Sequence, residues 1–60
     1  MKLTIKDKAE MKRMGYEYRA WFISPRGIPF HKDFTTYREM HEFIKAAKTV
    51  GTRLVETERR

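Results

Sequence analysis

Hydrophobic residues recur at helical spacing between residues 36 and 50, and this stretch predicts the longest helix of the chain. Thr36 stands where an N-cap is expected, and Glu39 three residues later completes the spacing of a capping box. Gly51 follows as the left-handed residue that commonly ends a helix. The helix therefore presents an apolar stripe that needs a partner surface. The stripe consists of Tyr37, Met40, Phe43, Ile44, Ala47 and Val50.

Residues 16–34 predict a β-hairpin. Side chains alternate along the first segment, which is rich in the aromatic and β-branched residues that strands favour. The turn falls at 24–27, and Pro29 in the returning strand indicates an edge, because proline cannot donate to a ladder. We expect the long helix to cover the more apolar face of this hairpin. That face carries Tyr16, Tyr18, Ala20, Phe22, Ile28, Phe30 and Phe34.

The two ends of the chain carry weaker patterns. Met1, Leu3 and Ile5 alternate with polar residues, as in a short strand or a frayed end. Asp7 and Glu10 then have capping-box spacing, which predicts a short helix over about residues 7–14. Residues 52–57 alternate and suit a third strand.

Together these elements predict a single domain over residues 1–60. Its order is strand, strand, helix, strand, preceded by the short N-terminal helix. We expect an α+β fold of two layers, in which one long helix packs on a three-stranded sheet.

Composition excludes several classes of protein. The chain has no cysteine, so we expect no disulfide and no thiolate metal site. It has no apolar run of the ~20 residues that cross a bilayer, and its first residues lack the core of a signal peptide. We therefore expect a cytoplasmic protein without a membrane partner.

Charge indicates the kind of partner. Fourteen Lys and Arg stand against eight Asp and Glu, a net charge of +6, which favours nucleic acid or an acidic protein surface. Residues 1–15 carry five of the cations and two of the acids, and so contribute +3. The alternative is that excess charge serves solubility alone.

Catalytic residues are scarce. The only serine lies in the predicted turn, no cysteine is present, and the two histidines lack the spacing of a metal or acid–base site. The three glycines are isolated, so no glycine-rich phosphate loop exists. We expect no enzyme activity, no cofactor and no metal.

Trp21 decides how the other face of the hairpin is used. If the N-terminal segment leaves the indole exposed, it forms a stacking platform for bases or a protein hot spot. The alternative is that this segment covers Trp21 and buries it with Met11 and Met14.

If Trp21 is exposed, we expect the face opposite the long helix to bind nucleic acid, either DNA or RNA. Arg19, Lys32 and Arg53 would contact phosphates while Trp21 stacks. The alternative is an inhibitor or adaptor that binds a host protein through Trp21, Ile23 and a strand edge, which could also form a homodimer. The candidate binding residues are Arg19, Trp21, Ile23, Arg26, His31, Lys32 and Arg53.

Three short motifs within residues 16–45 carry a family resemblance. Tyr-Arg-Ala-Trp-Phe-Ile starts at Tyr18, Gly-Ile-Pro at Gly27 and Phe-Thr-Thr-Tyr-Arg-Glu at Phe34. In this order they resemble the small arm-site DNA-binding domain of phage-type tyrosine recombinases, whose third strand, however, precedes its helix. The resemblance implies that the sheet enters the DNA major groove. The residues that would then meet DNA are Arg19, Trp21, Arg26, His31 and Lys32.

The element order is also similar to that of small phage-encoded inhibitors of host RNA polymerase. That similarity implies a host protein partner. Both resemblances imply an accessory protein of a phage or mobile element.

Overall fold

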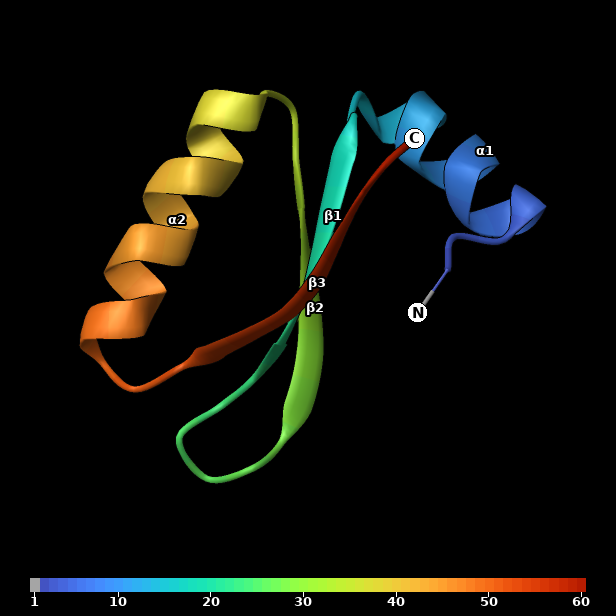
Figure 1. Ribbon diagram of the computed structural model, residues 1–60. Helices are drawn as coiled ribbons and strands as arrows, with labels where there is room; N and C mark the ends of the chain where they lie inside the picture. Colours follow the sequence, from blue (N-terminus) through green and yellow to red (C-terminus); the bar gives the residue numbers. More distant parts are fainter. Residues whose placement is uncertain (1) are drawn as a thin grey trace.

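The computed structural model describes residues 2–60 and shows an α+β fold, as the sequence predicts (Figure 1). Two helices and a three-stranded sheet alternate in the order α-β-β-α-β. The elements are α1 (Ile5–Met14), β1 (Tyr18–Ile23), β2 (Pro29–Phe34), α2 (Tyr37–Thr49) and β3 (Arg53–Arg59).

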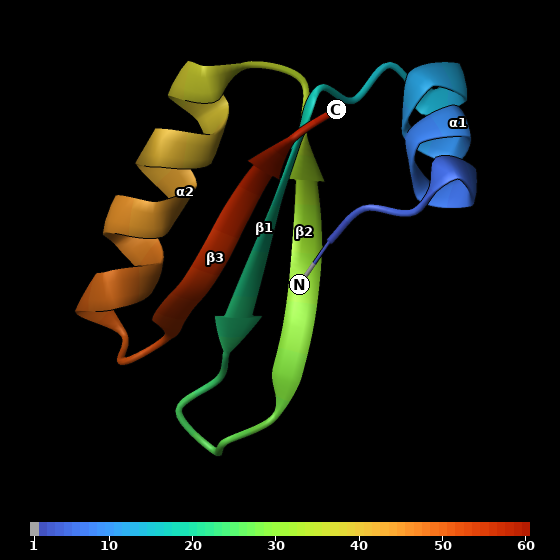
Figure 2. The same cartoon turned by 45° about the vertical axis from the view of Figure 1, so that its right-hand side comes forward.

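The sheet is antiparallel, with β1 in the centre and the strand order β2-β1-β3 (Figure 2). The β1–β2 register is continuous and places Trp21 opposite His31. The β1–β3 register shifts between Trp21 and Phe22, as at a β-bulge. Both β2 and β3 are therefore edge strands, and β2 is the more regular of the two.

Helix α2 covers one face of the sheet, and the main core lies between them (Figures 1 and 2). The predicted face assignment is confirmed for β1, because its even-numbered residues point to this core. Ala20, Phe22, Phe34 and Met40 are buried there, with Tyr18, Phe43 and Ile44 packed against them.

Of the residues expected under α2 on this apolar face, three are not covered by the helix. Tyr16 packs in the second cluster, because it belongs to the link after Gly15 and not to the strand, so strand alternation does not apply to it. Ile28 and Phe30 remain exposed, because the hairpin tip extends past the end of α2 (Figure 1). Phe30 is nevertheless stacked on Phe22, with ring centroids 5.2 Å apart.

The ends of α2 follow the sequence prediction with one difference. The Thr36 hydroxyl caps the helix by accepting a hydrogen bond from the Glu39 backbone N–H at 3.2 Å. The Glu39 carboxylate accepts from the hydroxyls of Thr35 and Thr36, so it does not close the expected capping box. Gly51 has φ 85° and supplies the left-handed residue that follows the helix.

Helix α1 lies on the opposite face of the sheet and begins earlier than predicted (Figure 2). Thr4, not Asp7, is its N-cap: the Asp7 N–H donates to the Thr4 hydroxyl, and the Asp7 carboxylate accepts from the Thr4 N–H. The sequence predicts that residues 1–6 are extended or frayed, and no strand forms at Leu3 or Ile5, since Leu3 precedes the cap and Ile5 starts the helix. Met1 lies outside the described residues.

Candidate functional site

The structure divides the predicted site residues among three places. Arg19, Trp21 and Ile23 alternate with the core residues of β1, so they lie on the α1 face of the sheet, with His31 and Arg53 as their cross-strand neighbours. Lys32 lies on the opposite face, opposite Ala20. Arg26 lies in the hairpin turn, away from both. These residues do not converge on one surface.

Trp21 is buried, so its predicted role as an exposed stacking platform is wrong. Its side chain is 8% exposed and packs in a cluster with Leu3 and Met11, against Tyr16. The early start of α1 places Met11 on the inward side of the helix, and the Leu3 N–H donates to the Glu58 carboxylate at 3.0 Å. The alternative prediction, that Met11 and Met14 bury the indole, is confirmed for Met11 but not for Met14, which is exposed.

Arg19 is paired with acidic neighbours, which does not favour its predicted phosphate contact. Its Nε and Nη2 donate to the two carboxylate oxygens of Asp33 at 2.6 and 3.0 Å, and Nη1 lies 3.6 Å from Asp7. The hydrogen bonds that Arg19 donates to Asp33 raise the pKa of the guanidinium, which is only 12% exposed. A bidentate pair of this kind fixes both side chains.

The α1 face is not positively charged either. At its strand positions Arg19 and Arg53 stand against Asp33, Glu56 and Glu58. Arg53 and His31 are exposed and Ile23 is half-buried. This face therefore lacks the excess of cations that a phosphate-binding surface requires.

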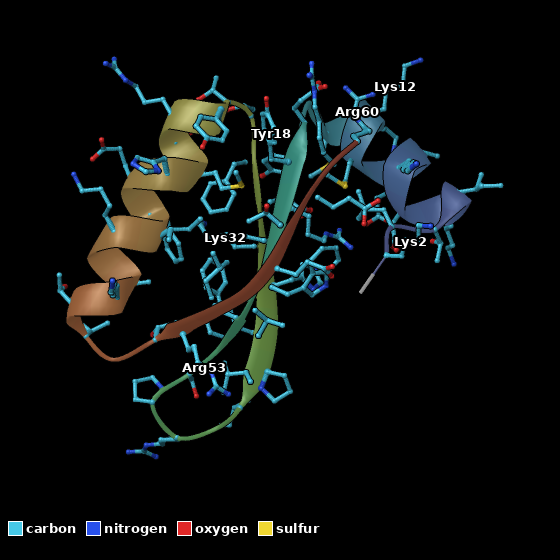
Figure 3. All side chains as sticks on the ribbon, viewed as in Figure 1. Lys2, Lys12, Tyr18, Lys32, Arg53 and Arg60 are labelled. Carbon is cyan, nitrogen blue, oxygen red and sulfur yellow. The ribbon has the colours of Figure 1, made fainter. Side chains whose placement is uncertain are left out.

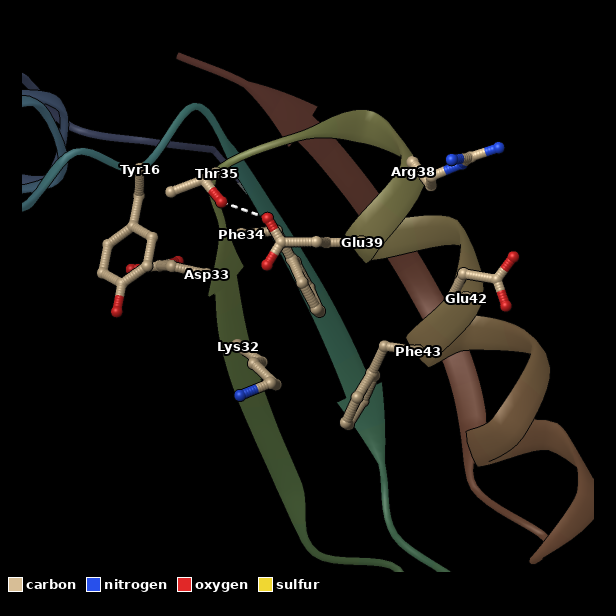
Figure 4. Close-up of a pocket in the computed structure, with 9 residues that line it drawn as sticks. All are labelled: Tyr16, Lys32, Asp33, Phe34, Thr35, Arg38, Glu39, Glu42 and Phe43. Carbon is tan, nitrogen blue, oxygen red and sulfur yellow. Dashed lines mark hydrogen bonds between the residues drawn. The ribbon is translucent and has the colours of Figure 1, made fainter.

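Lys32 contacts aromatic rings of the main core instead. Its ammonium lies 5.8 Å from the ring centroid of Phe34 and 5.5 Å from that of Phe43, within cation–π distance. These residues line an open groove of about 640 Å³ between β2 and α2 (Figure 4).

A group of cations that sequence reasoning did not select lies on residues 2–13, in α1 and just before it. Lys6 and Arg13 lie on the side of the helix away from the buried Met11, as helical geometry requires. Among residues 2–60, no ion pair joins an acid to any cation of this segment. All five of these cations are exposed: Lys2, Lys6, Lys8, Lys12 and Arg13.

Arg60 extends this group. Its Nε donates to the carbonyl oxygen of Tyr16 at 2.8 Å, which holds the end of β3 beside the end of α1 (Figure 3). Arg59 and Arg60 both pair with Glu17 at 3.1 Å, so two guanidiniums share one carboxylate. Arg59 itself lies opposite Tyr18 on the α2 face, with its guanidinium 5.8 Å from the ring centroid, and its hydrogen bond with Glu17 raises its pKa. We define the basic surface as Lys2, Lys6, Lys8, Lys12, Arg13 and Arg60.

One signal in the sequence pointed to this surface. The excess charge is already greatest in the first quarter of the chain. The position of these cations depends on the packing of α1 against the sheet, which leaves all five exposed, and on the position of the C-terminus.

No protein-family model, curated protein or solved structure matches this chain. The two family resemblances therefore stay predictions. Within residues 2–60, no helix is long and apolar enough to cross a membrane, and no cluster of His, Asp and Glu side chains could hold a metal ion.

Proposed function

We propose that the protein is a small non-enzymatic module that binds nucleic acid through the basic surface on α1 and not through its sheet. The observation that supports this proposal is the set of five exposed cations on residues 2–13, none of them paired with an acid in the described part of the chain. Unpaired cations of this kind can neutralise phosphates and release the counterions condensed on the nucleic acid. The cost is small, because no internal ion pair has to break first.

The residue types favour contacts with the backbone of the nucleic acid. Four of the five cations on this segment are lysines, which bind phosphate as flexible point charges and do not offer the planar fork with which arginine recognises guanine. A ten-residue helix is about 15 Å long and so runs past about nine phosphate charges of a duplex. We therefore propose binding with little dependence on sequence.

The alternative of a protein partner held by Trp21 loses its anchor, since the indole is buried. In line with both resemblances, we propose a cytoplasmic accessory protein of a phage or mobile element.

Two matched variants test the proposal. The α1 variant replaces Lys6, Lys12 and Arg13 by Gln, and the α2 variant replaces Arg38, Lys45 and Lys48 by Gln. Both lower the net charge from +6 to +3 at exposed helix positions, so they differ only in location.

Fluorescence anisotropy with labelled duplex DNA and duplex RNA at ~0.1 M salt provides the measurement. We expect the α1 variant to lose about 100-fold or more in affinity, because three phosphate contacts disappear. The α2 variant should lose much less. Equal losses in the two variants would assign binding to the overall charge and not to α1.

A further inference from the structure

The outer edge of β2 is an open and regular template for another strand. The Ser24 N–H donates to the Ile28 carbonyl at 2.9 Å, and the register continues without a break to Phe34. Hydrogen-bonded and non-hydrogen-bonded residue pairs alternate along an antiparallel ladder. The even-numbered residues of β2 therefore form hydrogen bonds with β1, and the backbone groups of His31 and Asp33 point outward. Pro29 fits this pattern, since its missing N–H would also point outward.

The groove beside this edge is apolar with one accessible cation. Phe34 and Phe43 form its floor, and the ammonium of Lys32 lies over both rings (Figure 4). Arg38 and Glu42, of opposite charge, line the outer side of the groove on α2 (Figure 4).

The acids at the groove do not pair with Lys32. Asp33 binds Arg19, and Glu39 accepts hydrogen bonds from Thr35 and Thr36 but keeps its negative charge. Among the described residues no ion pair involves Lys32, so its ammonium is available to an acidic side chain directly opposite it on an added strand.

We propose that this edge binds an extended peptide that pairs antiparallel with β2 as a fourth strand. An acidic side chain of the peptide lies opposite Lys32, and apolar side chains two residues to either side lie opposite Phe30 and Phe34. All three point to the α2 face of the sheet, since directly opposite residues share a face. Backbone hydrogen bonds supply affinity, and the acidic–apolar pattern supplies specificity.

A second copy of the chain fits this edge less well. In the register that pairs His31 with Asp33 of the second copy, the two Lys32 residues lie directly opposite each other. Like charges in this position destabilise pairing, and an edge lysine is a common barrier to self-association. In this register a different segment with an acidic residue opposite Lys32 pairs better than a second copy.

The proposed peptide site is independent of the nucleic-acid proposal. The basic surface lies on α1, whereas the groove lies on the α2 face of the sheet (Figure 2). A protein that fails to bind nucleic acid can still bind the peptide, and the reverse also holds.

The probe is the seven-residue peptide Thr-Val-Thr-Glu-Thr-Val-Thr. We expect binding with a dissociation constant below about 1 mM, with the largest amide shifts in ¹H–¹⁵N spectra at His31 and Asp33. A peptide with lysine in place of the glutamate should bind at least tenfold more weakly. The Lys32→Glu protein should reverse this preference.

A backbone variant provides the matched control. His31→Pro removes an outward N–H without removing a bond to β1, and should weaken peptide binding at least tenfold, whereas His31→Ala should change it less than twofold. The proposal is overturned if no shifts occur at millimolar peptide, or if the glutamate and lysine peptides bind equally. Dimerisation of the peptide-free protein in sedimentation experiments, with β2 protected, would assign the edge to a second copy instead.

Discussion

Trp21 illustrates how one residue can satisfy two interpretations of the same sequence. Strand alternation correctly places it on the face opposite α2. Whether that face is open depends on tertiary contacts of a short helix, which local sequence does not determine. The indole is buried because Leu3 and Met11 cover it.

Trp21→Ala should therefore reduce the stability of the fold and not simply remove a contact with a ligand. Truncation of a large buried aromatic residue costs about 3–5 kcal/mol, a large share of the stability of a 60-residue domain. Urea denaturation followed by circular dichroism measures this loss, and Trp21→Phe should retain most of the stability. If Trp21→Ala folded as well as the wild type but no longer bound nucleic acid, the sheet face would be the binding surface after all.

Arg19 and Asp33 form the second structural pair on this face. Arg19→Gln leaves the Asp33 carboxylate, which is 17% exposed, without its main cation, and should destabilise the fold by roughly 2–3 kcal/mol. A double-mutant cycle with Asp33→Asn in urea measures their coupling. Nucleic-acid affinity of the folded Arg19→Gln protein should stay within twofold, and a loss as large as that of the α1 variant would contradict its structural role.

At the scale of elements, the caps were easier to predict for α2 than for α1. The α2 stripe, its N-cap at Thr36 and the following Gly51 all agree, and the helix forms where they predict it. In the N-terminal segment two capping boxes fit the spacing, one from Thr4 to Asp7 and one from Asp7 to Glu10. The capping box from Thr4 to Asp7 is the one that forms. The helix that it starts packs Met11 against Trp21.

Replacement of the α2 cap should have a small and local effect. Thr36→Ala leaves the Glu39 N–H without its partner and should cost about 1 kcal/mol. Thermal unfolding measures this loss, and Thr36→Ser should restore most of it. A loss below about 0.3 kcal/mol would show that the hydroxyl contributes little to the helix.

The attachment of α1 should depend on pH through Asp7. Hydrogen bonds from Thr4 lower the pKa of the Asp7 carboxyl below its usual value, with a smaller contribution from Arg19. A depressed pKa in the folded protein stabilises it at pH values above the unfolded pKa, and this contribution is lost as the pH falls through the folded pKa. We therefore expect α1 to loosen below about pH 4.

Trp21 fluorescence reports this loosening, because the indole becomes exposed when α1 detaches. Acidification should shift the emission to longer wavelength before global unfolding, and Asp7→Asn should remove the part of the shift due to this carboxyl. An identical acid transition in Asp7→Asn would assign it to other carboxylates.

At the scale of the molecule, the sequence predicted the fold class and the total charge but not the charged face. Hydrophobic periodicity determines which side of each element is buried, and this sufficed for the main core around Ala20 and Phe22. The position of the cations required the packing of α1 and the hydrogen bond from Arg60 to Tyr16, which joins residues 44 positions apart. Local patterns carry no signal for such a contact.

The salt dependence of nucleic-acid binding tests the location of the basic surface most directly. If the five cations of residues 2–13 contact phosphates, a plot of log affinity against log salt concentration should have a slope of about −4.5 for duplex DNA. The α1 variant should reduce the slope to about −2, and the α2 variant should leave it at about −4.5. An unchanged slope in the α1 variant, or a reduced slope in the α2 variant alone, would contradict the assignment of nucleic-acid binding to α1.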